Sequence, residues 1–296
     1  MRYAQALARY QRQLRADGCS AHTRAAYFRD LRALSRWLGS DPAVGKITPD
    51  TLARFLASDE ALQTPDGHPR AAITVNRTKS ALRSFFAFCV ASGWVRENPT
   101  RLIRSSPARP KEPATLEPGE IDRLRTVLAA KTGSLAARDR LILELLLGTG
   151  IRLGSLVGLD IGDIDLQSGT IRIHAKGGAE ERVFLNPRLV GMLGGFLRES
   201  PTQGLCGPHI PLFRSQSGRR LGARAIQLKF AQWVEAAGID RPVSVHSLRH
   251  TFATRLYEKT GDLYLVQRAL GHRQITTTEI YARVSDERLR RAVAAP

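Results

Sequence analysis

Residues 246–281 read HSLRHTFATRLYEKTGDLYLVQRALGHRQITTTEIY, and this stretch decides how the rest of the chain is interpreted. His246 and Arg249 stand three residues apart, so a helix places both on one face. His272 follows a Leu-Gly pair typical of a helix end, and Tyr281 comes nine residues later. Arginine can hold a phosphate, histidine can move a proton, and tyrosine can attack once a base or nearby cations lower its pKa from about 10. The stretch therefore indicates nucleophilic chemistry on a phosphate ester.

A zinc site is the main alternative for the start of this stretch. His246 and His250 have the His-x-x-x-His spacing of some zinc helices. The residue after the first histidine is Ser247 and not the glutamate that serves as general base in such sites, and Arg249 between the two histidines would repel a cation. The only other candidate, Cys-Gly-Pro-His at 206–209, is an isolated fragment with no matching pair. We therefore expect no metal, and we expect His250 to pack or to form hydrogen bonds.

Two further basic residues complete the candidate set. Arg152 follows the turn glycine Gly150, at the point where one helix is expected to end and another to begin, and a helix N-terminus favours anions. Lys176 follows an expected strand and precedes two glycines, so it lies at a hairpin tip that can reach into a DNA groove. A lysine there can protonate a leaving oxygen. Taken alone, either residue would be interpreted as a solvated turn residue.

The charge of the chain points to a polyanionic partner. Its 296 residues include 45 Lys and Arg against 27 Asp and Glu, a formal net charge of +18. Residues 1–104 hold 17 basic and 8 acidic side chains and residues 105–296 hold 28 and 19, so both parts are basic. Arginine outnumbers lysine 38 to 7. High-GC codon usage can explain that ratio, but it does not explain the net charge.

The cysteine content and the apolar segments of the chain indicate its cellular compartment. The three cysteines are scattered and odd in number, so no disulfide framework is expected. The N-terminal segment reads as an amphipathic helix and not as a signal peptide, and no apolar run has the length of a membrane span. We expect a soluble, cytoplasmic protein.

Periodicity and breakers predict two domains. Residues 1–104 read as helices only, at about 3–16, 20–39, 48–58 and 71–92. Four prolines between 104 and 119 predict a linker at 105–116. Residues 117–296 mix both element types, with strands near 164–166, 170–174 and 181–185 and helices near 118–130, 135–148, 187–198, 221–237, 246–258 and 262–270. The predicted fold is mainly α with a small antiparallel β-sheet.

The motifs together resemble those of the tyrosine recombinase (phage integrase) family, most closely its Xer-like members. The resemblance rests on RLGSL at 152–156, KGG at 176–178, HSLRHTFAT at 246–254, LGH at 270–272 and IY at 280–281, in family order and near family spacing. It implies a helical core-binding domain that clamps DNA, an α+β catalytic domain, and a C-terminal exchange tail at 284–296. The family's six catalytic positions fall on Arg152, Lys176, His246, Arg249, His272 and Tyr281.

The resemblance implies site-specific DNA recombination. Tyr281 would attack the scissile phosphate to give a 3′-phosphotyrosyl enzyme, with no metal, ATP or other cofactor. The partners implied are double-stranded DNA with an inverted-repeat site and a tetramer on DNA, formed from one chain or together with a paralogue. Chromosome-dimer resolution, plasmid maintenance and mobile-element integration all stay open.

Two positions depart from the family pattern. Ser155 stands three residues after the first arginine, where the family usually has an acid that orients active-site groups, and Ala175 replaces a frequent glycine before the lysine. Ser155 keeps open a catalytically weakened accessory DNA-binding protein. A type IB topoisomerase, which uses nearly the same residues to relax DNA, is the other alternative.

Overall fold

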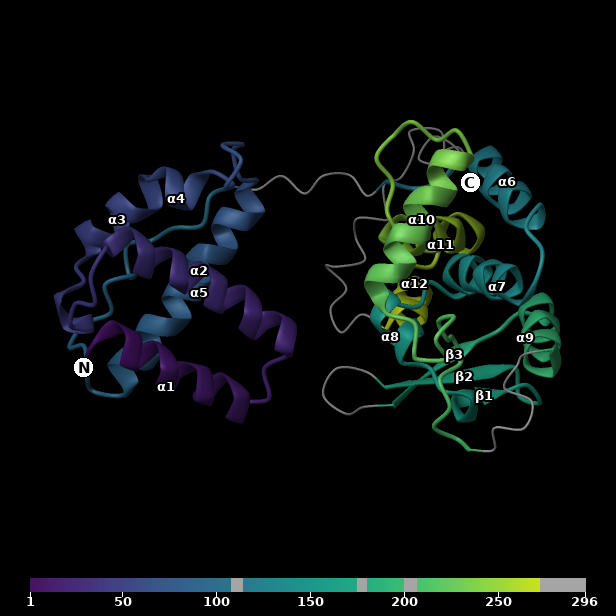
Figure 1. The fold of residues 1–296 in the computed structure, drawn as a ribbon, viewed down its shortest axis with the longest axis horizontal. Coiled ribbons are helices and arrows are strands. Elements are labelled where there is room, and N and C mark those ends of the chain that lie inside the picture. Colours follow the sequence, from purple (N-terminus) through teal and green to yellow (C-terminus); the bar gives the residue numbers. More distant parts are fainter. Residues whose placement is uncertain (108–113, 175–179, 200–206, 272–296) are drawn as a thin grey trace, which may run out of the picture. The chain divides into compact units, whose positions relative to one another are not determined.

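The computed structural model describes residues 1–107, 114–174, 180–199 and 207–271. The chain divides into two compact units, Met1–Pro110 and Lys111–Pro296 (Figure 1). Each unit has a hydrophobic core of its own. The first unit is helical, and the second combines helices with one small antiparallel sheet. This confirms the predicted fold class.

The described part of the first unit contains five α-helices and one short 3-10 helix, whose ends follow local sequence signals. Ser20 and Thr48 cap α2 and α3, because each hydroxyl accepts the backbone N–H three residues on, at 3.1 Å. Gly39 ends α2 in the left-handed conformation, at φ +62°. The elements are α1 (Tyr3–Ala16), α2 (Ala21–Leu38), η1 (Val44–Lys46), α3 (Pro49–Ala57), α4 (Asp59–Leu62) and α5 (Ala72–Ala91).

Aromatic packing and one ion pair hold this unit together. Tyr3 and Tyr10 of α1 pack edge-on against Phe85 of α5, at 5.2 and 5.5 Å between ring centroids. The Asp30 carboxylate of α2 is 1% exposed and accepts two hydrogen bonds of 2.9 Å from the Arg77 guanidinium of α5. These aromatic side chains therefore form core contacts.

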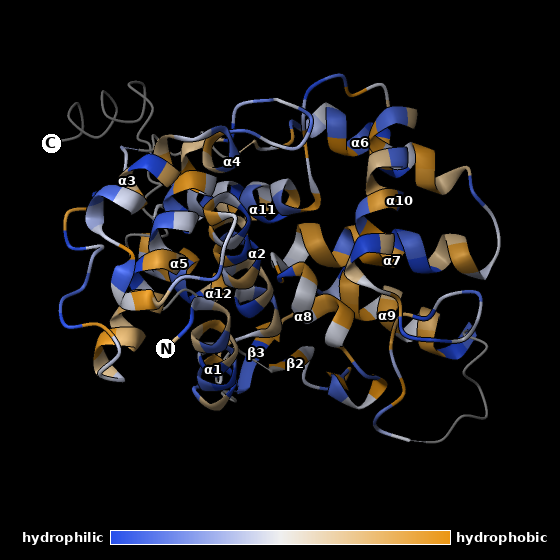
Figure 2. Ribbon diagram, turned by 60° about the vertical axis from the view of Figure 1, so that its left-hand side comes forward, coloured by the Kyte–Doolittle hydropathy of each residue, from blue (hydrophilic) through white to orange (hydrophobic). Residues whose placement is uncertain are grey.

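The second unit places helices around a three-stranded sheet. Helix α7 is buried along most of its length and contacts α6, α9 and α11, and polar as well as apolar residues alternate along it (Figure 2). The strands run antiparallel in the order β1-β2-β3. The elements are α6 (Pro118–Ala129), α7 (Ser134–Thr149), α8 (Leu153–Gly158), η2 (Ile161–Asp163), β1 (Ile164–Asp165), β2 (Thr170–His174), β3 (Glu180–Phe184), α9 (Pro187–Glu199), α10 (Ala223–Ala236), α11 (Val245–Thr260) and α12 (Leu263–Leu270).

The register of the sheet separates its two faces. Ile171 pairs with Val183, and both side chains are buried in the core of the second unit. Phe184, the next residue along β3, is 74% exposed.

Over the described parts of the chain, no helix has the length and apolar character needed to cross a lipid bilayer.

Candidate active site

Arg249 is the buried centre of the candidate site. It lies on α11, its side chain is 4% exposed, and its guanidinium donates to two backbone carbonyls, Gly150 O at 2.6 Å and Leu270 O at 2.7 Å. These carbonyls belong to the ends of α7 and α12, where the helix dipoles are negative. A buried charge is tolerated only where its donors are satisfied, and the planar guanidinium can reach two carbonyls at once. Arg249 therefore ties three helices together.

Arg152 reaches the same helix end from another direction. It is the residue before α8, in extended backbone conformation, and its side chain is exposed. Its Nη2 donates to Gly271 O at 3.3 Å. Two predicted arginines that are 97 positions apart in sequence thus contact neighbouring carbonyls at the end of α12. Cations gathered there suit an anionic ligand.

A tight glycine turn makes this convergence possible. Gly150 ends α7 with φ +62°, a conformation that is costly for residues with a side chain. A Cβ at this position would overlap the ring of Phe252 on α11. The glycine lets α11 approach the end of α7, and its carbonyl is free to accept from Arg249.

His246 lies one helical turn before Arg249. Its imidazole packs edge-on against that of His250, at 4.5 Å between ring centroids and 82° between planes. Partial burial, and then the positive charges of Arg249 and Arg152, lower the pKa of His246 below 6.5. The imidazole is therefore mainly neutral at pH 7, which is the state that accepts a proton.

A cleft of about 430 Å³ opens beside these residues, lined by both His246 and Arg249. Arg224 and Gln227 of α10 line it too, and the sequence analysis did not single them out. Their spacing of three places them on one helical face, but many surface residues share that spacing. Only the tertiary structure, in which α10 packs against α6 and α8 and lines the cleft together with α11, identifies them as part of the cleft.

The other predicted residues lie outside the described part of the chain. Lys176 falls between β2 and β3, His272 directly follows Gly271, and Tyr281 lies nine residues further on. Of the two departures, Ser155 lies half-buried on α8, one turn after Arg152, and Ala175 is not described. The roles of all six residues stay predictions.

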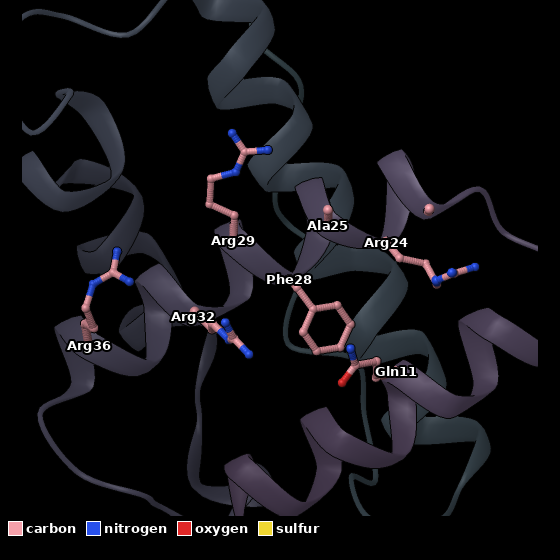
Figure 3. Close-up of a pocket in the computed structure, with 8 residues that line it drawn as sticks. Gln11, Arg24, Ala25, Phe28, Arg29, Arg32 and Arg36 are labelled. Carbon is pink, nitrogen blue, oxygen red and sulfur yellow. The ribbon is translucent and has the colours of Figure 1, made fainter. Parts of the chain in front are cut away.

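A second basic surface lies on the first unit. Four arginines of α2 line a groove of about 480 Å³ together with Gln11 of α1 and the buried Phe28; they are Arg24, Arg29, Arg32 and Arg36 (Figure 3). Arg36 forms a 2.8 Å ion pair with Glu60. Among the described residues, Arg29 and Arg32 have no acidic partner. No acidic side chain lines the groove.

Comparison with known proteins gives the same assignment for both units. Residues 114–288 match the family described as Phage integrase family, and residues 7–93 match its N-terminal SAM-like domain. Tyrosine recombinase XerC of Vibrio vulnificus (strain YJ016) is 33% identical over 285 residues, which cover 96% of this chain and 88% of that one. XerC of Salmonella typhi is 37% identical over 212 residues, covering 71% of this chain and 69% of that protein.

Solved structures agree with these matches. The post-cleavage complex of the XerH site-specific recombinase with palindromic difH substrate is 25% identical with a TM-score of 0.75, covering 92% of this chain and 79% of that one. A lambda integrase dimer bound to a core site shares the fold, with a TM-score of 0.71 at 23% identity, over 94% of this chain and 97% of that one. The chain belongs to the phage integrase family, and within it to the Xer-like tyrosine recombinases.

Proposed function

We propose that this chain is a site-specific recombinase that cuts and rejoins double-stranded DNA through a 3′-phosphotyrosyl bond to Tyr281. One observation carries the proposal. Arg152 and Arg249 converge on the carbonyls of Gly271 and Leu270, at the point where the chain continues into His272. Two distant segments thereby bring cationic groups to one place, the end of α12. This end of α12 is where the scissile phosphate would be held.

The reaction proposed is a transesterification at phosphorus. The phenolate oxygen of Tyr281 forms a bond to the phosphorus while the bond to the 5′ oxygen breaks. Lys176 protonates that leaving oxygen, and His246 accepts the proton of the tyrosine, a role to which its lowered pKa is suited. The 5′-hydroxyl of a second DNA then attacks the phosphotyrosine, which restores the phosphodiester and releases the enzyme.

Electrostatic stabilisation falls to the remaining residues. Arg152 and Arg249 neutralise the non-bridging oxygens of the pentacoordinate transition state, and His272 donates a hydrogen bond to one of them. A guanidinium has five N–H donors, so it can bond to a backbone carbonyl and to a phosphate together. The phosphotyrosyl link retains the energy of the phosphodiester, and the reaction as proposed consumes no ATP and routes no step through a metal.

The proposed division of labour follows the two units. Residues 1–104 would clamp the DNA, 105–116 would link, and 117–296 would carry the chemistry, with residues 284–296 exchanged between protomers. The unpaired arginines of α2 support a DNA-binding role for the first unit. Related complexes include a lambda integrase tetramer on a Holliday junction. We infer a tetramer on an inverted-repeat site, from one chain or with a paralogue, acting in the cytoplasm.

Trapping of covalent adducts tests the proposal. Purified protein is incubated with nicked fragments of genomic DNA in EDTA, the reaction is stopped with SDS, and the attached DNA is sequenced. Nicks let a short strand diffuse away after cleavage, so the adduct accumulates. Tyr281→Phe is the control, because it keeps the ring and removes the nucleophilic oxygen. The expected result is adducts at one short inverted-repeat site, absent from the Tyr281→Phe protein.

The other outcomes separate the alternatives. Adducts scattered without a common site would favour a DNA-relaxing enzyme of the type IB class. DNA binding without any adduct would favour a weakened accessory protein, the function that Ser155 keeps open. In that case Ser155→Glu should restore cleavage if the missing carboxylate is the cause.

A further inference from the structure

Glu181 stands on the inward face of the sheet, where an acidic side chain is unexpected. It pairs with Ile173 across the ladder and lies two residues before Val183, so all three side chains belong to one face of the sheet. Ile173 and Val183 are buried in the core, whereas Glu180 and Arg182 on the opposite face are exposed. A carboxylate in an apolar row needs a cationic or hydrogen-bonding partner.

The carboxylate of Glu181 lies against Gly271. This glycine ends α12 with φ +60°, and a Cβ on it would overlap Oε2 of Glu181 and lie 3.0 Å from its Cδ and 3.2 Å from its Oε1. Arg152 donates to the carbonyl oxygen of the same glycine at 3.3 Å. Standard bond lengths then place guanidinium and carboxylate less than about 10 Å apart, within a Debye length at 0.1 M salt.

Among the residues that the structure describes, neither charged side chain has an ionic partner. The Glu181 carboxylate forms no side-chain hydrogen bond or ion pair with them, and Arg152 has no acidic residue of this set within ion-pair distance. Arg152 also lies near Arg249, since both contact the end of α12, and two cations repel each other. A carboxylate beside Gly271 offsets part of that repulsion by its negative charge.

We propose that Glu181 is a positioning residue for Arg152. It holds the exposed guanidinium at the end of α12 before DNA arrives, and it supplies from β3 the negative charge that Ser155 does not supply from α8. The inference rests on the proposed function, because Arg152 has a phosphate to hold only if the chain cleaves DNA. Orientation of Arg152 in advance lowers the barrier of cleavage more than it strengthens binding of intact DNA.

Single-turnover cleavage tests this role. The substrate is a nicked duplex carrying the sequence recovered from the adducts, at saturating concentration. Glu181→Gln should slow adduct formation about tenfold or more, the loss typical when a carboxylate that orients an active-site group is removed. The Kd for the same duplex should stay within about twofold. Glu181→Asp, which keeps the charge, should recover part of the rate.

Glu180→Gln is the matched control, with the same change of charge on the same strand but on the outer face. Combining Glu181→Gln with Arg152→Lys should slow cleavage by less than the product of the two single effects, because the residues act together. Ser155→Glu should raise the rate of the Glu181→Gln protein.

Four results would overturn the inference. A wild-type protein that forms no adduct defeats both this inference and the proposed function. If the wild type forms adducts and Glu181→Gln is as fast, only this inference fails. If the rate losses of Glu181→Gln and Arg152→Lys multiply fully in the double variant, the two residues act independently and Glu181 does not position Arg152. If Glu181→Gln weakens DNA binding as much as it slows cleavage, Glu181 has a general structural role.

Discussion

Arg249 and Arg152 contact the same helix end, yet their different burial predicts very different losses of stability when each is removed. Arg249→Ala should lower the free energy of unfolding by about 3 kcal/mol, because the carbonyls of Gly150 and Leu270 both lose a charged donor inside the protein. Arg152→Ala should lower it by less than about 0.5 kcal/mol, since its side chain is exposed. Urea unfolding of both variants measures the difference. Equal losses would contradict the assigned burial.

His246 should make cleavage depend on pH in a defined direction. Because the pKa of His246 in the folded protein lies below 6.5, the neutral base should persist at pH 6.5 and disappear at lower pH. The unfolded chain takes up the proton first, so this residue should also make the folded state less stable as pH falls from 6.5 through the folded pKa.

Single-turnover rates between pH 5 and pH 8 on the nicked duplex check this expectation. The wild-type rate should fall on the acid side with an apparent pKa below 6.5. His246→Asn should be slower at pH 7 and should lose that acid limb. An unchanged acid limb in His246→Asn would show that another group titrates there.

At the scale of elements, the turn from α7 into α8 carries the site. Gly150→Ala should destabilise the protein by roughly 3 kcal/mol, since it adds left-handed strain of about 1 kcal/mol to an overlap with Phe252. Gly238→Ala is the control, because Gly238 also has a positive φ, +60°, but a Cβ there meets nothing within 4 Å. Urea unfolding should give a larger loss for Gly150→Ala. Similar losses would mean that Phe252 moves aside without cost.

At the scale of the whole molecule, a net charge of +18 predicts DNA binding that weakens steeply with salt. Removal of a phosphate contact reduces the slope of log K against log salt by about 0.9. Arg29→Ala and Arg32→Ala should each have this effect on the full-length protein, because these α2 arginines lack acidic partners among the described residues. Arg54→Ala is the control with the same change of net charge, since Arg54 pairs with Asp50 at 3.1 Å. Fluorescence anisotropy with labelled duplex measures the slopes. Equal slopes for all variants would show that the α2 groove does not contact the DNA phosphates.

The sequence alone was enough for the longer helices, the strands and the family. Helix periodicity, together with the caps at Ser20 and Thr48 and the glycine at Gly39, predicted α1, α2 and α3 to within a residue or two. These signals are local, so one segment contains all the information. The four-residue helix α4 was not predicted, because one turn is too short to establish a period.

The same distinction between local and long-range information applies to the candidate site. Residue type and order were sufficient to select Arg152, His246 and Arg249, since their chemistry is a property of each side chain. The bonds of Arg249 to the ends of two helices depend on Gly150 and Leu270, about 100 and 20 positions away in sequence. The lowered pKa of His246 depends on its burial, on Arg249 in the same helix and on the distant Arg152. The inward position of Glu181 depends on strand register. Those features arise only when α7, α11, α12 and the sheet pack together, because distance in space, and not in sequence, sets hydrogen bonds, desolvation and charge interactions.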